Sequence, residues 1–265
     1  MTQLKSPIEI LKLLNKSNCR ECGYAACLAF ASAVFKGQKP LSACPHLGQD
    51  VIQEFAQESQ NNDVELIPDE PLEDFKNRLT KIDLAEAAEK VGADFSNGRL
   101  TLKVCGKDFS VDREGNFYSE IHIHSWITGP FLSYIIDGAG RPVTGKWVSM
   151  RELKNGNDWY RFFVHKCEKS LKRVADTYTD LFEDMLHIFN GKKVANHYES
   201  DVSLVLHPLP RLPILICYWK PEEGLESSLN IFFDSTAGDN LNVQYLYSLG
   251  TGLTTMFEKI AQRHG

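Results

Sequence analysis

The chain has 265 residues, a net charge of -6, 43% hydrophobic residues and 24% charged residues, an ordinary composition for a globular protein with a sizeable core. An acidic chain lacks the basic surface that non-specific nucleic-acid binding needs, and no stretch reaches the roughly 18 to 20 apolar residues of a membrane span. The N-terminus has neither the apolar core nor the cleavage site of a signal peptide. We therefore expect a cytoplasmic protein with no membrane span and no nucleic-acid partner.

The first predicted region, residues 1–56, is marked by its cysteines. The chain has seven cysteines, an odd number, and four of them lie within the first 44 residues. A secreted disulfide scaffold normally has an even number of cysteines spread over its loops. Clustered thiols in a chain without an export signal are more typical of metal ligands.

These four cysteines have the spacing of an iron–sulfur site. Cys19, Cys22, Cys27 and Cys44 follow the pattern C-x2-C-x4-C-x16-C. A cubane cluster needs four converging thiolates, and a tight loop can supply three of them while a returning segment supplies the fourth. The spacing therefore predicts one [4Fe–4S] cluster on these cysteines.

The residues around the cysteines fit this prediction. Gly23 gives the backbone freedom to wrap a cluster at a point where a side chain would obstruct the turn. A helix is expected from Ala25 to Phe35, with Cys27 in its first turn, where the positive end of the helix dipole favours a thiolate. Gly37 ends this helix, and Pro45 follows the last cysteine, where a chain reversal tolerates a missing backbone donor.

Two other metal centres use the same kind of ligand. Structural zinc sites usually have paired short cysteine spacings, and this chain has one such pair instead of two. A [2Fe–2S] cluster also takes four thiolates. Both alternatives stay open at the level of spacing, and the [4Fe–4S] cluster is favoured over each.

An acidic linker is predicted at residues 57–72 and a larger domain at residues 73–265. The linker is polar and contains Pro68 and Pro71, so it has little to bury. Strands and helices beyond it do not alternate as regular βαβ units, which favours a mostly antiparallel sheet with packed helices. The chain as a whole is expected to be an α+β protein, with a small helical iron–sulfur module before the sheet domain.

The elements of the larger domain follow from its apolar spacing. Pro130 is expected at the first position of a helix, and Pro208 and its neighbouring prolines are expected to confine their strand to a sheet edge or crossing. Helices are predicted at 75–90, 130–137, 171–188 and 243–260, and strands at 100–112 (a hairpin), 117–126, 146–153, 202–207, 212–219 and 229–234.

The run NCRECGYAACLAFA at 18–31, followed by CPHL at 44–47, resembles the small iron–sulfur domain of the corrinoid iron–sulfur protein large subunit. It is similar also to the cluster domain in one subunit of the ion-translocating ferredoxin:NAD oxidoreductase. The resemblance covers about residues 5–50. It implies a [4Fe–4S] cluster on the same four cysteines that passes single electrons at low potential. Ala26 departs from the threonine or glycine that often precedes the third cysteine, and the chain is too short to contain a corrinoid-binding barrel.

The larger domain resembles an uncharacterised family that accompanies such modules in anaerobic bacteria and archaea. The segments that carry this resemblance are KWVSMREL, WYRFF, HPLPRLPI and NIFFDSTAG. It implies an anaerobic setting and no particular reaction.

Few residues of the larger domain suggest chemistry. His122 and His124 would lie on the same side of a strand and form a weaker second metal site, although exposed strand faces commonly alternate in the same way. Cys105 and Cys217 are interpreted as buried, small apolar residues.

A set of charged residues is expected either to line a pocket or, the favoured alternative, to form one internal ion-pair network: Arg151, Glu152, Arg161, Arg211 and Asp234. The sequence has no phosphate loop, dinucleotide-binding glycine pattern or nucleophile elbow, and whether the protein is an enzyme stays open.

Two classes of function are consistent with these features. In the first, the protein is a redox accessory protein whose cluster relays electrons between a ferredoxin-like donor and a partner enzyme or corrinoid protein. Lys12, Lys16 and Arg20 would then form a positive patch for an acidic donor, or they are solubilising charges. In the second, the larger domain binds a small molecule or cofactor, for example a corrinoid, which the cluster reduces or senses. A purely structural cluster is a third, weaker hypothesis.

Overall fold

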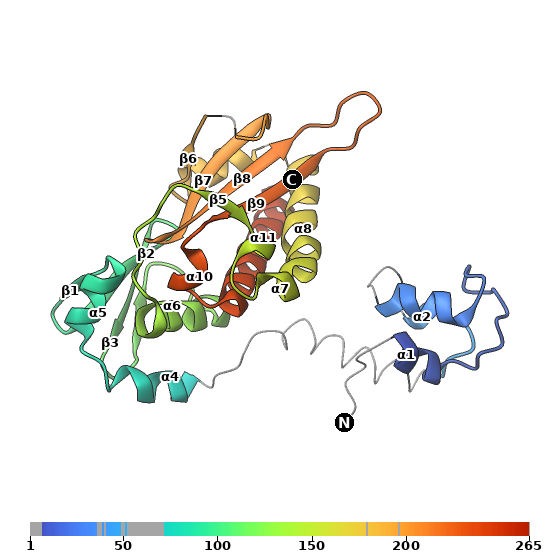
Figure 1. Cartoon of the computed structure of the whole chain (residues 1–265), viewed down its shortest axis with the longest axis horizontal. Coiled ribbons are helices and arrows are strands. Elements are labelled where there is room, and N and C mark those ends of the chain that lie inside the picture. The colour runs from blue at the N-terminus through green and yellow to red at the C-terminus, as the bar shows by residue number, and fades with distance from the viewer. Residues whose placement is uncertain are drawn as a thin grey trace. The chain divides into compact units, whose positions relative to one another are not determined.

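The computed structural model describes residues 7–35, 39, 41–48, 51, 72–178, 180–195 and 197–264. The chain divides into two compact units, Met1–Leu66 and Ile67–Gly265, which are treated separately below (Figure 1). Apart from Leu72, the predicted linker at 57–72 lies outside the described residues. No helix within the described ranges is long and apolar enough to cross a lipid bilayer.

The first unit is small and helical. It contains α1 (Pro7–Leu13), α2 (Cys27–Phe35) and a short 3-10 helix, η1 (Leu41–Ala43). The predicted helix at 25–35 is therefore confirmed, and it begins at Cys27. One compact apolar cluster holds the unit together: Ile10, Leu14, Cys27, Phe30, Ala31, Val34, Leu41 and Cys44.

The second unit begins with a four-stranded antiparallel sheet in the order β1-β2-β3-β4. The predicted hairpin is confirmed, since Leu100 pairs with Val111 and Leu102 with Phe109. The side chains of these four residues are buried. The strands are β1 (Asp94–Ser96), β2 (Arg99–Val104), β3 (Lys107–Asp112) and β4 (Phe117–Ser119), and the accompanying helices are α4 (Leu72–Leu79), α5 (Leu84–Val91) and α6 (Ser125–Asp137).

A five-stranded antiparallel sheet forms the rest of the second unit, in the order β5-β9-β8-β7-β6. The strands are β5 (Trp147–Ser149), β6 (Lys192–Lys193), β7 (Val202–Leu209), β8 (Leu212–Trp219) and β9 (Ser228–Asp234). The other elements are a 3-10 helix η2 (Met150–Glu152), α7 (Gly156–Phe163), a π-helix η3 (Val164–Glu168), α8 (Lys169–Thr177), α9 (Leu181–His187), α10 (Ala237–Asn240) and α11 (Val243–His264). The α+β class and the antiparallel pairing are thus confirmed.

The core of the second unit lies between the five-stranded sheet and the helices α7, α8 and α11 (Figure 1). Successive strand residues face opposite sides of a sheet. Ile214 and Ile216 accordingly belong to the main core, whereas Leu215 and Cys217 belong to a smaller cluster on the other face. The two sheets are connected by a hydrogen bond from the Cys105 amide to the Pro208 carbonyl, 3.3 Å long.

Two predicted long helices are each divided into two. The predicted helix at 75–90 consists of α4 and α5, because the Asp83 carboxylate accepts the amides of Ala85 and Glu86 and caps a new helix. The predicted helix at 171–188 consists of α8 and α9, because Tyr178 has an extended backbone that ends α8. In both cases the apolar spacing continues across the break.

Three other predictions were wrong in their boundaries. The strand predicted at 117–126 ends at Ser119, because β3 pairs only with Phe117–Ser119. The helix predicted to start at Pro130 begins at Ser125, so Pro130 lies inside α6, where it removes one backbone donor. The strand predicted at 146–153 is three residues long and continues into η2. Pro208 lies at a crossing, as expected, since β6 pairs with Leu204 and Val205 and the Pro208 carbonyl beyond them accepts the Cys105 amide of the other sheet.

Candidate metal centre

The cysteine loop of the first unit is shaped by residues with left-handed backbone. Lys16, Asn18, Arg20 and Gly23 have φ angles of 57°, 50°, 66° and 83°, a conformation that is uncommon for residues other than glycine. The Asn18 side-chain oxygen accepts the Cys27 amide at 2.7 Å, and the Gly23 amide donates to the Arg20 carbonyl at 2.9 Å. These bonds tie the loop to the first residue of α2.

Gly23 is required for its conformation and not for space. A Cβ atom at this position would have no described protein atom within 4 Å, so a side chain would disturb the turn through the φ angle of 83° and not through a contact. The positive φ angle, which glycine adopts readily, is the remaining reason for this residue. Gly37, the expected end of α2, lies outside the described residues.

The four predicted ligand cysteines differ in exposure. Cys27 and Cys44 are 8% and 6% exposed and belong to the apolar cluster of the first unit, against which the half-buried Cys22 also packs. Cys19 is exposed. All four are free thiols. Three of the predicted ligands therefore lie in or against one apolar cluster, and the fourth, Cys19, faces solvent.

The remaining three cysteines have a different environment. Cys105, Cys167 and Cys217 are buried in the second unit. Burial raises the pKa of the Cys105 thiol and of the Cys167 thiol to about 12, and it also raises the pKa of Cys217. A thiol with a raised pKa is a poor metal ligand at neutral pH, because metals bind the thiolate. These residues act as small apolar side chains, as expected for Cys105 and Cys217.

His122 and His124 do not lie on a strand. Both are exposed residues between β4 and α6, and their ring centroids are 6.0 Å apart. In the described ranges, no His, Cys, Asp or Glu completes a group of three ligands with them.

Among the described residues, the five charged residues predicted to act together neither line one pocket nor form one ion-pair network. The Arg211 guanidinium donates to the carbonyls of Lys90, at 2.7 Å, and Gly140. The buried Asp234 carboxylate accepts the amides of Thr144, at 3.0 Å, and Gly145, at 2.7 Å. Both residues therefore anchor the segment between α6 and β5, and no ion pair joins them in the part of the chain that the structure describes.

The other three charges are separate from this anchor. Glu152 accepts the Ser149 amide and hydroxyl, both at 2.8 Å, and thereby caps η2. The Arg151 guanidinium lies 5.7 Å from the centre of the Tyr160 ring. The part of the chain that the structure describes has no ion pair to Arg161.

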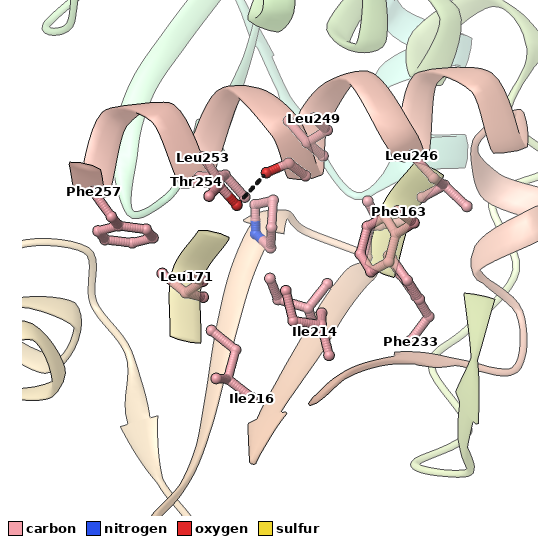
Figure 2. A pocket seen from close by; sticks show the side chains of 14 residues that line it. Phe163, Leu171, Ile214, Ile216, Phe233, Leu246, Leu249, Leu253, Thr254 and Phe257 are labelled. Atoms are coloured by element: carbon pink, nitrogen blue, oxygen red, sulfur yellow. Dashed lines mark hydrogen bonds between the residues drawn. The ribbon is translucent and has the colours of Figure 1, made fainter. Parts of the chain in front are cut away.

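An apolar cavity of about 20 Å³ lies between α11 and the five-stranded sheet (Figure 2). Phe163, Leu171, Ile214 and Phe257 are among the side chains that line it. A volume of this size is close to that of a single water molecule, and an apolar lining offers water no partners. The cavity is a packing defect of the core that holds no organic ligand.

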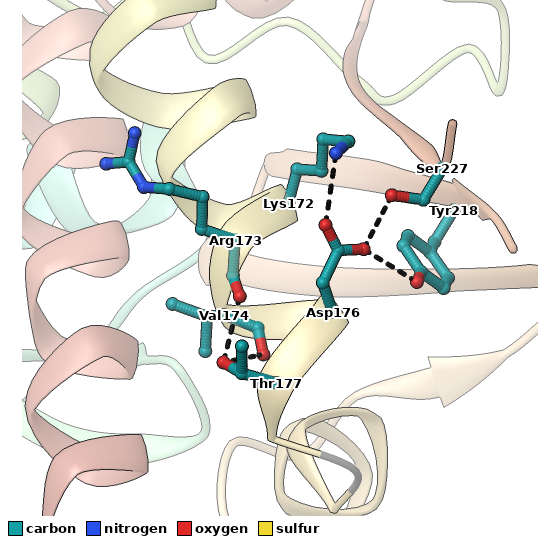
Figure 3. Close-up of polar contacts among 7 residues, drawn as sticks. All are labelled: Lys172, Arg173, Val174, Asp176, Thr177, Tyr218 and Ser227. Carbon is teal, nitrogen blue, oxygen red and sulfur yellow. Dashed lines mark hydrogen bonds and ion pairs between the residues drawn. The ribbon is translucent and has the colours of Figure 1, made fainter. Parts of the chain in front are cut away.

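Asp176, at the end of α8, is the centre of a polar cluster that the sequence did not indicate (Figure 3). Its carboxylate accepts the hydroxyls of Tyr218, at 2.9 Å, and Ser227, at 2.6 Å, and pairs with Lys172 at 3.0 Å. Burial and the Asp176 carboxylate raise the pKa of Tyr218 to about 12. A phenol held in its protonated form is a structural link here, and it connects α8 to β8.

The comparisons with known proteins agree with the division into two units. Residues 14–46 match a family described as "Putative Fe-S cluster". This match confirms the iron–sulfur part of the predicted resemblance.

Three curated relatives are gamma subunits of the acetyl-CoA decarbonylase/synthase complex. The protein from Methanosarcina acetivorans is 34% identical over 92 residues, which are 35% of this chain and 18% of that protein. The protein from Methanocaldococcus jannaschii is 43% identical over 42 residues, which are 16% of this chain and 9% of that protein. The gamma 1 subunit from Methanosarcina thermophila is 32% identical over 92 residues, which are 35% of this chain and 18% of that protein. The chain spans less than a fifth of the length of these relatives.

No solved structure matches the chain significantly. Residues 83–256, about two thirds of the chain, match a family described as a domain of unknown function, DUF3786, which agrees with the expectation of an uncharacterised family. The chain therefore belongs to the DUF3786 family and has an iron–sulfur domain before the family's defining region.

Proposed function

We propose that the first unit binds one [4Fe–4S] cluster through Cys19, Cys22, Cys27 and Cys44, and that the protein transfers single electrons in anaerobic metabolism. The observation that carries this proposal is the coincidence of the four thiols with the segment that matches the iron–sulfur family. The relatives are subunits of a named complex from methanogens, which supports the anaerobic setting.

The residues present fit such a cluster. Four thiols supply the ligands that a [4Fe–4S] cluster needs. Cys27 is the first residue of α2, a helix with no acidic residue in its first turn, so the positive end of the helix dipole favours a thiolate there. The apolar cluster that contains Cys27 and Cys44 would keep water from the buried side of the iron.

The donor set favours electron transfer over catalysis at iron. Four cysteine ligands would leave no iron with an open position at which a substrate could bind. When bound, the cluster would accept and release one electron. The exposure of Cys19 would bring one edge of the cluster close to solvent, where a partner can approach.

Three basic side chains, one at the end of α1 and two in the cysteine loop, would suit an acidic partner. Lys12, Lys16 and Arg20 are exposed, although the chain as a whole has a net charge of -6. A local positive patch steers an acidic protein and speeds its association. We assign this patch to a ferredoxin-like donor, with a partner enzyme or corrinoid protein as the acceptor.

Charge reversal of the patch tests this assignment. The double variant Lys16→Glu/Arg20→Glu should be reduced by ferredoxin about 10-fold more slowly at low salt, with a smaller difference at high salt because ions screen the attraction. Anaerobic stopped-flow absorption of the cluster band measures the rate. Lys192→Glu/Lys193→Glu on β6 is the matched control, since both lysines are exposed in the second unit.

Two results would contradict the proposal. A reduction rate that ignores both the variants and the ionic strength would rule out this docking surface. If the isolated protein converted a substrate and Cys27→Ser abolished that activity, the cluster would be catalytic and the proposal of electron transfer would be wrong.

A further inference from the structure

The exposed corner of the cysteine loop contains a second set of metal-binding side chains. One potential ligand atom from each of Cys19, Glu21 and His46 lies within 4.8 Å of the other two. His46 Nε2 is 3.2 Å from a Glu21 carboxylate oxygen. In the described ranges this is the one group of three histidine, cysteine or acidic residues whose potential ligand atoms lie this close together.

Among the described residues, the other predicted ligands have no such group of neighbours. Cys27 and Cys44 lie in the apolar cluster of the first unit, and Cys22 packs against it. The side chains of that cluster are aliphatic and aromatic, and within it only the thiolates could bind iron. In the part of the chain that the structure describes, Cys19 is the one predicted ligand that combines exposure with an imidazole and a carboxylate within reach.

The backbone holds this group in place through the other ligands. Asn18 and Arg20, on either side of Cys19, both have left-handed backbone, and Asn18 is hydrogen-bonded to the Cys27 amide. On the other side, the Leu47 amide donates to the Cys44 carbonyl at 3.4 Å, so His46 lies within a turn that starts at a ligand. Each member of the group is within two residues of a cysteine that would bind the cluster.

We infer that Glu21 and His46 are reserve ligands for the iron atom bound by Cys19. This inference rests on the proposed function, because it presupposes the cluster. If the Cys19–iron bond broke, the departing thiolate would take up one proton from water, and a ring nitrogen of His46 would give its lone pair to the same iron. No electron would be transferred, and the net charge of the cluster with its ligands would rise by one. Imidazole is an established ligand in iron–sulfur centres, and the Glu21 carboxylate, 3.2 Å from His46 Nε2, orients the His46 ring.

The consequence is that the four cysteines are unequal. Loss of the buried Cys27 leaves its iron among apolar side chains without a replacement. Loss of Cys19 leaves its iron beside an imidazole and a carboxylate. The Cys19 corner is therefore the place where the cluster can exchange a ligand and remain assembled.

Single and combined substitutions in the full-length protein, purified anaerobically, test this inference. Cys19→Ala should keep at least half of the wild-type iron and sulfide, and the reduced cluster should show a new nitrogen hyperfine coupling by pulsed electron paramagnetic resonance. The triple variant Cys19→Ala/Glu21→Gln/His46→Ala should lose this coupling and should contain about 10-fold less iron than Cys19→Ala. The matched control is Cys19→Ala/Glu183→Gln/His187→Ala, which removes an exposed Glu–His pair of similar length, 3.3 Å, from α9, and it should behave like Cys19→Ala.

The outcomes separate this inference from the function on which it rests. If wild-type protein holds iron and Cys19→Ala loses it as completely as Cys27→Ala does, the reserve ligands are disproved and the cluster stands. If the triple variant keeps the iron of Cys19→Ala, another ligand acts and the inference is also wrong. Wild-type protein without iron contradicts the proposed function, and this inference with it.

Discussion

The two units of this protein are stabilised in different ways. The apolar cluster of the first unit has eight members, and two of them, Cys27 and Cys44, are predicted metal ligands. The second unit has a continuous apolar core between its helices and two sheets, and Cys105 and Cys167 are incidental members of that core. A small set of apolar residues seldom stabilises a fold alone, whereas a domain of the second unit's size buries enough surface to do so.

The comparison indicates how each unit depends on metal. In the first unit, the left-handed residues around Cys19 and the hydrogen bond from the Cys27 amide to Asn18 shape the predicted ligand loop, so we expect binding of the cluster and folding to be coupled. In the second unit, buried side chains and hydrogen-bonded loops complete the fold among the described residues. We therefore expect the first unit to need its cluster and the second to fold without it.

The largest expected effect is the loss of the first unit's fold when the cluster is removed. Cys27→Ser/Cys44→Ser should abolish cooperative unfolding of the first unit, because a structural metal centre can contribute about 10 kcal/mol or more. Hydrogen exchange should show protection lost at Ile10 and Phe30 and retained at Leu100.

Cys217→Ala, which replaces a buried thiol of the second unit, is the control and should leave the first unit protected. A fragment that starts at Glu70 should also fold without metal. If that fragment is unfolded, or if the double variant keeps the first unit folded, the contrast between the units is wrong.

A core substitution in the second unit should have the opposite pattern. Phe131 is fully buried, and its ring centre is 4.8 Å from that of Phe109. Phe131→Ala should therefore lower the free energy of unfolding of the second unit by about 3–5 kcal/mol without changing the iron content per folded chain. Urea unfolding and metal analysis measure the two quantities.

The matched control for this substitution is Phe162→Ala. Phe162 is 48% exposed, so its replacement should cost roughly 0.5 kcal/mol or less. Loss of iron in proportion to the destabilisation by Phe131→Ala would show that the two units depend on one another.

A smaller effect is expected at Asp234, which anchors the segment between α6 and β5. Burial by itself raises the pKa of this carboxyl, but hydrogen bonds from Thr236, Gly145 and Thr144 outweigh it and hold the pKa below its ordinary value. Asp234→Asn should cost about 2–3 kcal/mol of the free energy of unfolding at neutral pH.

The same carboxylate predicts a dependence on pH. Because its pKa is lowered in the folded state, its contribution is fully present above the ordinary pKa and is lost as the pH falls through the lowered value. Asp234→Asn should therefore flatten the acid limb of the stability curve of the second unit, whereas Glu223→Gln, at an exposed position, should leave it unchanged. An unaltered acid limb in Asp234→Asn would mean that other carboxylates dominate.

Much of the fold could be predicted from local pattern, and the failures have identifiable causes. The hairpin at 100–112 alternates strictly, and the long apolar runs of β8 and β9 suit buried strands. The break between α4 and α5 had a signal in the sequence, since Asp83 precedes Glu86 by three residues as in a helix-capping pattern. The break at Tyr178 had none, and it is visible only from the backbone that ends α8.

Two other failures reflect tertiary packing. The residues after Pro130 in α6, Phe131 and Leu132, are fully buried, and this packing outweighs the helix-breaking tendency of an internal proline. The alternation at His122 and His124 indicated a strand, but β3 begins at Lys107 and its pairing with β4 ends at Ser119.

The candidate site could be predicted only in part. Cysteine spacing identified four thiols without any knowledge of the fold, because spacing along the chain determines which ligands can converge. The group formed by Cys19, Glu21 and His46 depends on the loop bringing residues 21 and 46 together. Their positions within two residues of predicted ligand cysteines were the available signal, and the contact between them required the structure.

The measurement that tests the central claim most directly is native mass spectrometry of the full-length protein purified without oxygen. We predict one dominant species whose mass exceeds that of the polypeptide by four irons and four sulfides, corrected for the protons that the four thiols lose on binding. A species with two irons and two sulfides would show that the cluster is [2Fe–2S] and not [4Fe–4S]. A species with one zinc ion and no sulfide would contradict the proposed function.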